Sequence, residues 1–90
     1  MAATYQLKIL TPQKKVLDEA IESLVAPGAA GYLGILANHA PIITTLVAGV
    51  LKVKASGTEK SYRISGGILR VARNDAMLLS EGVEEIPVGA

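Results

Sequence analysis

The side chains best suited to catalysis or metal binding are few in this chain and stand apart from one another. His39 is the one histidine and cysteine is absent, so a zinc site would have to be completed by carboxylates, which is uncommon. As a general base His39 would need a nucleophile and an orienting acid, and no spacing assembles them. Glu84 and Glu85 are adjacent, so in a strand their carboxylates point to opposite faces. We therefore expect no catalytic centre, no metal and no cofactor, and we assign His39 to positioning a loop or contacting a partner.

Residues 27–41 form the segment that strand geometry explains least, with three glycines and two prolines. Gly28, Gly31 and Gly34 recur every three residues, yet a nucleotide-binding loop would lead into a helix N-terminus, and no helix pattern follows. One interpretation is a compact loop or short edge strand that caps one end of a sheet. The other is an apolar docking surface, because exposed apolar area often marks a partner site. Its side chains would be Tyr32, Leu33, Ile35 and Leu36.

The elements that would position these residues are strands. Val, Ile and Thr make up 21 of the 90 residues, and their β-branched side chains favour a pleated sheet. Apolar and polar residues alternate over residues 4–10, and two further pairs of alternating runs are typical of hairpins. The first hairpin joins residues 50–55 to 60–65, and the second joins 68–73 to 76–80 through Asn74-Asp75. The pattern indicates an antiparallel β-sandwich or barrel.

Two segments leave alternatives open. Residues 15–18 and 21–25 alternate as short strands, with Ile21, Ser23 and Val25 on one face, but a helix over residues 13–25 competes with that interpretation. Gly66-Gly67 interrupts two strand runs, which favours a bulge or a bend where the chain changes sheet.

Length and charge exclude several classes of protein. Ninety residues accommodate one small core, so we expect a single domain over residues 1–90. Nine basic and eight acidic residues leave a net charge of +1, which offers no electrostatic footprint for nucleic acid. No apolar run approaches the ~20 residues of a membrane helix, and the N-terminus lacks the pattern of a secretory signal.

The order and spacing of several short motifs resemble the N-terminal β-sandwich domain of the epsilon subunits of rotary ATP synthases. The most specific series is Gly31-Tyr-Leu-Gly34-Ile35, then His39-Ala-Pro41, then Ser65-Gly-Gly67-Ile68. Supporting pieces are residues 5–9, Thr11-Pro12, Pro27-Gly28, Thr44, Leu46 and Gly49. Together the matching stretches span nearly the whole chain.

The resemblance implies an all-β, antiparallel ten-stranded sandwich that serves as a non-catalytic rotor part of a proton- or sodium-translocating ATP synthase. Its implied partners, in a hetero-oligomer peripheral to the membrane, are the gamma shaft subunit and the ring of c subunits. The family's ring-facing loop falls on Gly28, Gly31, Tyr32, Leu33 and Gly34. If Leu33 is exposed, Leu33→Asp should disrupt ring docking and leave the fold intact; if Leu33 is core, the substitution should unfold the domain and the loop assignment is wrong. The shaft-contact positions fall on Thr11, His39 and Thr44. The implied location is the cytoplasmic face of a bacterial inner membrane, with the chloroplast stroma and mitochondrial matrix as alternatives.

Two departures from the family pattern shape these expectations. Tyr32 stands where many relatives carry an acidic residue, so the expected ring contact relies on aromatic burial more than on charge. Most bacterial and chloroplast members continue into a two-helix hairpin that can inhibit ATP hydrolysis, whereas this sequence stops at Ala90 after the helix breakers Pro87 and Gly89. If Ala90 is the natural end, we expect a short form without hairpin-mediated inhibition; if the sequence is part of a longer chain, that inhibition returns. A generic protein-binding sandwich and a cofactor-carrier domain are the alternatives from other classes.

Overall fold

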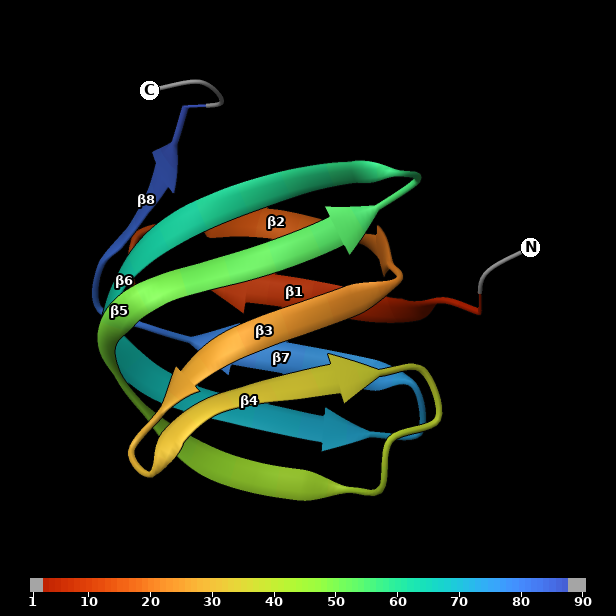
Figure 1. The fold of residues 1–90 in the computed structure, drawn as a ribbon. Coiled ribbons are helices and arrows are strands. Elements are labelled where there is room, and N and C mark those ends of the chain that lie inside the picture. Colours follow the sequence, from red (N-terminus) through yellow and green to blue (C-terminus); the bar gives the residue numbers. More distant parts are fainter. Residues whose placement is uncertain (1–2, 88–90) are drawn as a thin grey trace.

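The structure is a computed structural model that describes residues 3–87, and these residues form eight β-strands and no helix (Figure 1). The strands are β1 Tyr5–Leu10, β2 Lys15–Ile21, β3 Ser23–Gly28, β4 Gly31–Leu36, β5 Ile42–Ala55, β6 Thr58–Ala72, β7 Asp75–Leu79 and β8 Val83–Ile86. Their order in the sheet is β2-β1-β7-β6-β5-β3-β4, and β8 pairs with the first part of β6. The all-β prediction is confirmed.

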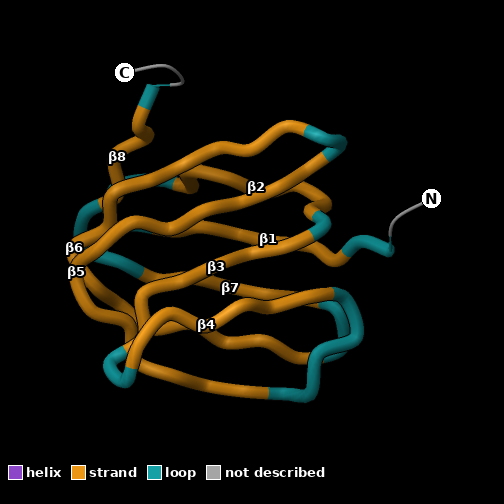
Figure 2. The backbone as a smooth tube through the Cα atoms, in the orientation of Figure 1, coloured by secondary structure: helices purple, strands orange, loops and turns teal. Residues whose placement is uncertain are grey.

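The two longest strands, β5 and β6, bend together and run through both layers of a sandwich. The bend lies where Leu46 pairs with Gly67 and Ala48 pairs with Ser65. One stretch of each strand joins β2, β1 and β7 in a back layer, and the other joins β3, β4 and β8 in a front layer (Figures 1 and 2). Counted by layer, β5 and β6 appear twice, which accounts for the ten strands that the resemblance implies. Gly66-Gly67 is thus the predicted bend between sheets, inside a single strand.

One strand pair differs from the antiparallel expectation. β1 and β7 run parallel, with Leu7 opposite Ala76 and Leu10 opposite Leu79. Parallel neighbours need a long crossover connection, and residues 11–74 supply it by passing through the front layer. As a result, the C-terminal ends of β1 and β7 lie side by side at the same end of the back layer.

The core lies between the two layers. Strand alternation turns Tyr5, Leu7 and Ile9 of β1 inward, as the sequence predicts, and leaves each of them at most 3% exposed. The other large side chains that are fully enclosed are Ile21, Leu24, Ile35, Leu51, Val53, Tyr62, Ile64, Leu69 and Leu78. Because the inward side chains of both layers meet here, the outward positions of each strand are free to carry function.

The segment over residues 13–25 forms strands, so the helix alternative is wrong. The predicted face with Ile21, Ser23 and Val25 is also wrong beyond Glu22, because Leu24 is buried and Val25 is exposed. Glu22 lies in a bend between β2 and β3, where its N–H donates to the Lys54 carbonyl at 2.7 Å. This bend shifts the alternation by one residue.

Both predicted hairpins are confirmed; the first turn is two residues long, because Thr58 and Glu59 already belong to β6, and the second lies one residue earlier than expected. Ser56 and Gly57 connect β5 to β6 with φ of 52° and 76°, and Arg73 and Asn74 connect β6 to β7 with φ of 52° and 59°. Positive φ at both central residues is the requirement of a two-residue type I′ turn, which matches the twist of the strands. Neither turn holds a lysine, so neither offers the attachment site that a carrier domain needs.

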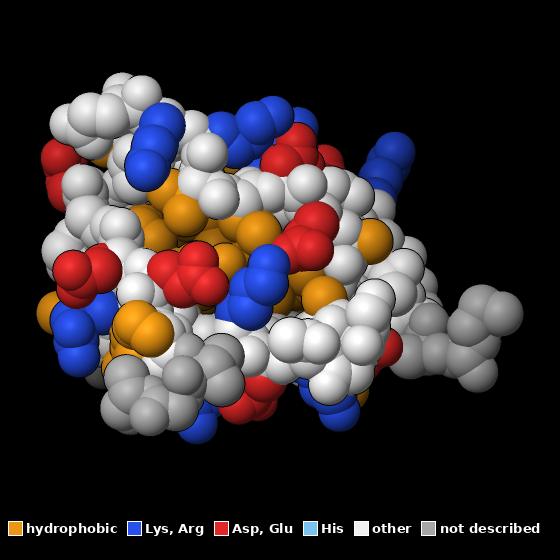
Figure 3. Space-filling view, turned by 90° about the horizontal axis from the view of Figure 1, so that it is seen from above, with side chains coloured by type: hydrophobic (Ala, Val, Ile, Leu, Met, Phe, Trp, Pro, Cys, Tyr) orange, Lys and Arg blue, Asp and Glu red, His pale blue; other side chains and the backbone are white. Residues whose placement is uncertain are grey.

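One side of the sandwich shows apolar side chains framed by charged ones when it is viewed from above (Figure 3). The Lys60 ammonium lies 3.2 Å from the Glu19 carboxylate and links β6 to β2. Both side chains are more than a third exposed, so the ion pair adds little stability. Val16, Leu17 and Ala55 pack against the core, and we infer that this apolar packing holds the layers together here.

A buried hydrogen bond ties the edge strand β4 to β1 across the core. The Tyr5 hydroxyl donates to the Ile35 carbonyl at 2.6 Å, and burial raises the pKa of this phenol well above its usual value. We expect Tyr5→Phe to lower the free energy of unfolding by about 2 kcal/mol, because the buried carbonyl loses its donor. Urea denaturation measures this. Tyr62→Phe is the control, since the Tyr62 hydroxyl makes no hydrogen bond within residues 3–87; an equal loss in both variants would contradict the argument.

Candidate partner-binding surfaces

The back layer carries large apolar side chains on its outer surface. Ile43 of β5 is 72% exposed, Ile68 of β6 is 48% exposed and Leu79 of β7 is 45% exposed. The register places Leu10, Leu79 and Ile68 side by side on β1, β7 and β6. We call the surface formed by Leu10, Ile43, Ile68 and Leu79 the outer apolar face. Exposed apolar groups gathered on a rigid sheet are typical of a protein-binding surface.

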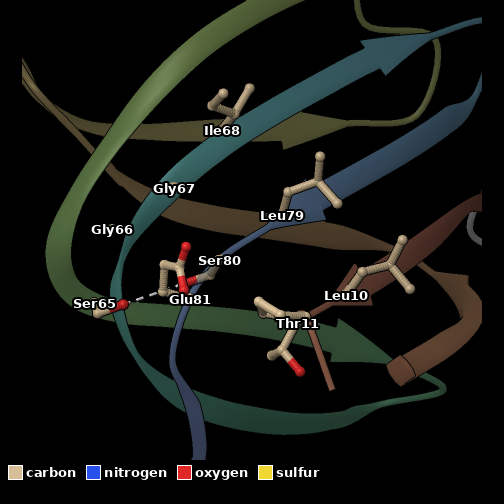
Figure 4. A pocket seen from close by; sticks show the side chains of 10 residues that line it. Leu10, Thr11, Ser65, Gly66, Gly67, Ile68, Leu79, Ser80 and Glu81 are labelled. Carbon is tan, nitrogen blue, oxygen red and sulfur yellow. Dashed lines mark hydrogen bonds between the residues drawn. The ribbon is translucent and has the colours of Figure 1, made fainter. Parts of the chain in front are cut away.

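A shallow groove of about 450 Å³ lies at one end of this face. Figure 4 shows Leu10, Leu79 and Ile68 beside it, with Gly66 and Gly67 contributing bare backbone. The φ angles of the two glycines are +110° and +148°, a backbone conformation that residues other than glycine rarely adopt. A Cβ on Gly67 would overlap the Leu79 carbonyl oxygen. The groove therefore depends on the glycine bend that carries β6 between the layers.

Hydrogen bonds fix the wall of the groove after β7. The Ser80 hydroxyl donates to the Gly82 carbonyl at 3.0 Å and lies 3.5 Å from the Ser65 hydroxyl. The Gly82 N–H donates to the Ser65 hydroxyl at 3.0 Å, and the Ser65 N–H donates to the Gly82 carbonyl at 3.0 Å. Ser80 is 6% exposed. This corner is rigid, so Leu79 is presented from a fixed backbone.

Thr11 and His39, two of the predicted shaft-contact residues, lie at opposite ends of the back layer. Thr11 follows β1, lines the groove, and closes the β1–β2 turn with its hydroxyl 3.2 Å from both the Lys14 carbonyl and N–H. His39 lies in the β4–β5 connection, beside the β6–β7 turn that precedes β7. The structure does not bring them together, but the outer apolar face extends between them.

Thr44, the third predicted shaft-contact residue, lies on β5 opposite Leu69. Leu69 points into the core, so Thr44 occupies the inward side of its strand and is half-buried. Its neighbours Ile43 and Thr45 are the exposed residues of this stretch. Sequence reasoning missed the exposed residues Ile43, Ile68 and Leu79. The signal that could have found them is that their strands carry apolar residues at consecutive positions, so that one of each two neighbours must point outward.

The imidazole of His39 is held by its own loop. The ring Nδ1 lies 2.7 Å from the Ala40 carbonyl, and the His39 backbone N–H donates to the Leu36 carbonyl at 3.2 Å. A carbonyl only accepts, so Nδ1 carries the proton in this contact. In the neutral ring Nε2 is then the acceptor that is left for a partner.

The predicted ring-contact residues gather on the β3–β4 hairpin. Gly28 and Gly31 face each other across its tip, and a Cβ on Gly28 would lie 2.6 Å from Leu33 Cδ2. Leu33 is half-buried and packs against the core, so it lies between the exposed and the fully enclosed positions that the sequence left open. Its partner across the hairpin is the buried Ala26, which fixes Leu33 on the inward face. Gly34 lies on the outer face, opposite Val25.

Tyr32 is the exposed large side chain next to the tip of this hairpin, at 63%. Its position depends on a neighbouring strand: a Cβ on Gly49 of β5 would lie 2.9 Å from Pro27 Cβ and 3.3 Å from the Tyr32 hydroxyl. The absence of a side chain at Gly49 therefore lets Pro27 and Tyr32 lie against β5. Of the two interpretations of residues 27–41, the edge strand is confirmed for β4, and docking by the hairpin stays a prediction.

Residues 3–87 hold no group of three or more His, Cys, Asp or Glu side chains placed to share a metal ion. No helix in this part of the chain is long and apolar enough to cross a membrane.

Residues 4–86 match the model of the ATP synthase delta/epsilon chain β-sandwich domain family. The chain is 42% identical over 88 residues to the ATP synthase epsilon chain of Pelotomaculum thermopropionicum, covering 94% of this chain and 66% of that relative. It is 37% identical over 89 residues to the sodium ion specific ATP synthase epsilon chain of Propionigenium modestum, covering 96% and 65%. The chain thus spans just under two thirds of the length of these curated relatives.

Solved structures share the fold. A chain in the Euglena gracilis mitochondrial ATP synthase structure of OSCP, F1 and c-ring superposes with a TM-score of 0.89 at 23% identity, over 94% of this chain and 55% of that one. A chain in the central stalk and c-ring structure of the Tetrahymena thermophila mitochondrial ATP synthase superposes with a TM-score of 0.78 at 17% identity, over 91% and 66%.

Proposed function

This chain belongs to the ATP synthase delta/epsilon chain β-sandwich domain family, and on that premise we propose that it is a non-catalytic central-stalk subunit of an ATP synthase. In this role the outer apolar face binds the gamma shaft subunit, and the β3–β4 hairpin binds the ring of c subunits. The observation that carries the proposal is the exposure of Ile43, Ile68 and Leu79 on one sheet face of a chain in this family.

The outer apolar face suits binding to a shaft subunit because it lies on a hydrogen-bonded sheet and is flanked by polar groups. Ile68 and Leu79 lie opposite each other on neighbouring strands, while Arg70 pairs with Met77 in the next row and Ile43 lies beside Arg70. An apolar centre with a polar rim is the usual anatomy of a stable interface. Burial of such side chains supplies affinity, and a sheet backbone loses little entropy on binding.

The β3–β4 hairpin suits the ring because it projects from the other layer at the end where β5 and β6 bend (Figure 1). Shaft and ring would then bind different elements of one rigid sandwich, so torque could pass between them without a flexible joint. For the location we propose the cytoplasmic face of a bacterial inner membrane, since the two sequence relatives described above come from bacteria.

Co-purification tests the proposed function. A tagged copy of the chain is isolated from its native membranes after mild detergent extraction, and the bound proteins are identified by mass spectrometry. We expect gamma, c and the catalytic subunits. Recovery of the tagged chain alone, or with unrelated proteins, would overturn the proposal and favour a generic binding sandwich.

Ring docking should depend on Tyr32. We expect Tyr32→Ser to weaken binding to detergent-solubilised c-ring about ten-fold, because roughly 1–2 kcal/mol of aromatic burial is lost. Binding is measured by biolayer interferometry with the chain immobilised. Leu36→Ser is the matched control, since Leu36 is 65% exposed on the same strand but lies at the end away from the hairpin tip. Equal losses for both variants would argue against docking through the tip.

A further inference from the structure

We infer that Asn38 and Asn74 form a clasp that positions the His39 end of the outer apolar face for the gamma subunit. The inference rests on the proposed function and adds two positioning residues to it. Asn38 lies in the β4–β5 connection and Asn74 in the β6–β7 turn, 36 residues apart in the chain.

The two residues are joined by two hydrogen bonds, one from the Asn38 backbone and one between the side chains. The Asn38 backbone N–H donates to Asn74 Oδ1 at 2.6 Å, and Asn74 Nδ2 donates to Asn38 Oδ1 at 2.9 Å. The Asn74 carbonyl also accepts from the Gln6 N–H at 3.0 Å. One asparagine thus joins three segments: the start of β1, the β6–β7 turn and the β4–β5 connection.

Turn chemistry alone does not account for this pair. Asn38 and Asn74 have φ of 66° and 59°, a conformation that glycine adopts at no steric cost and asparagine tolerates. Ser56 in the β5–β6 turn is also a non-glycine residue with positive φ. No side-chain hydrogen bond links that turn to another segment of residues 3–87. We therefore conclude that the asparagine side chains do more than permit a positive φ: they connect two loops by hydrogen bonds.

The clasp joins the segment that carries His39 to a distant part of the chain by hydrogen bonds. Within residues 37–41 the other hydrogen bonds of the described structure are local, from His39 to the Leu36 and Ala40 carbonyls. This segment leads directly into β5, where Ile43 forms the far end of the outer apolar face. Without the clasp, binding to gamma would have to order this loop, and that cost lowers affinity.

Two substitutions at position 74 separate the clasp from the turn. Asn74→Gly keeps the positive φ and removes both side-chain bonds. Asn74→Asp keeps an acceptor for the Asn38 N–H, and the Asn38 amide can turn so that its Nδ2 donates to the new carboxylate, which restores the second bond. Ser56→Gly is the matched control, because it makes the same kind of change in a turn outside the outer apolar face.

The experiment is a titration of the purified chain and its variants with purified gamma subunit by isothermal titration calorimetry at 25 °C, with thermal unfolding recorded in parallel. We expect Asn74→Gly to weaken binding about five- to ten-fold, and Asn74→Asp and Ser56→Gly to stay within about two-fold of the parent. A purely structural role would lower the melting temperature and leave the affinity of the folded protein unchanged.

The outcomes distinguish the two proposals. If the parent chain binds gamma and Asn74→Gly binds equally well, the clasp is overturned while the proposed function stands. If Asn74→Asp is as weak as Asn74→Gly, the hydrogen-bond argument is overturned. If the parent chain fails to bind gamma, the proposed function fails and the clasp inference fails with it.

Discussion

Gly67→Ala is expected to remove most of the stability of this domain. The residue has φ of +148°, and an added Cβ would overlap the Leu79 carbonyl oxygen and lie 3.1 Å from its carbonyl carbon. The obstacle is backbone of the neighbouring strand β7, which cannot rotate away as a side chain can. We expect a loss of about 4 kcal/mol or more from strain and overpacking together. Since small domains have only about 5–15 kcal/mol in total, guanidinium denaturation should show a partly unfolded or barely stable protein.

Gly57→Ala provides the matched control for this prediction. Gly57 also has positive φ, at +76°, but nothing lies within 4 Å of an added Cβ. Only the left-handed conformation is then penalised, at a cost of about 1 kcal/mol. A Gly67→Ala variant no less stable than Gly57→Ala would mean that β6 and β7 can separate at the bend, and that the groove beside Leu79 is not rigid.

The fold was predictable wherever a strand has one buried and one solvated face. In β1 the alternation of Tyr5, Leu7 and Ile9 with polar residues gives both the element and its inward side. The bend at Glu22 was not predictable, because a single residue with a hydrogen bond to Lys54 shifts the alternation, and that partner is 32 positions away in the chain. The parallel pairing of β1 with β7 likewise depends on the path of the whole chain between them.

The sequence predicted which segments form the candidate surfaces better than it predicted which of their side chains are exposed. Tyr32 is exposed, as the docking interpretation requires, but Leu33 is turned inward because it faces Ala26 across the hairpin. Ile43, Ile68 and Leu79 were missed, since an apolar residue in a β-rich sequence is normally assigned to the core. Their outward position follows from register: Ile68 and Leu79 pair with each other, and the adjacent pair of Leu69 with Leu78 is buried.

Ile68→Asp is expected to abolish high-affinity binding to the gamma subunit. Ile68 lies at the centre of the outer apolar face, between Thr45 of β5 and Leu79 of β7. Placing a carboxylate in an apolar interface loses the burial of the isoleucine and adds the cost of desolvating a charge. Together these should exceed about 3 kcal/mol, which is a loss of more than about 100-fold in affinity. Titration calorimetry with purified gamma measures it, and the 48% exposure of Ile68 means that the fold should survive.

The matched control is Leu36→Asp on the opposite layer. Leu36 is 65% exposed on β4, pairs with Ser23 and lies outside the outer apolar face. It therefore receives the same charge and the same loss of strand propensity, about 1 kcal/mol, without touching the proposed interface. We expect wild-type affinity for gamma in this variant. Strong binding by Ile68→Asp, or an equal loss in Leu36→Asp, would move the shaft contact away from β5, β6 and β7 and leave the exposure of Ile43, Ile68 and Leu79 to another partner.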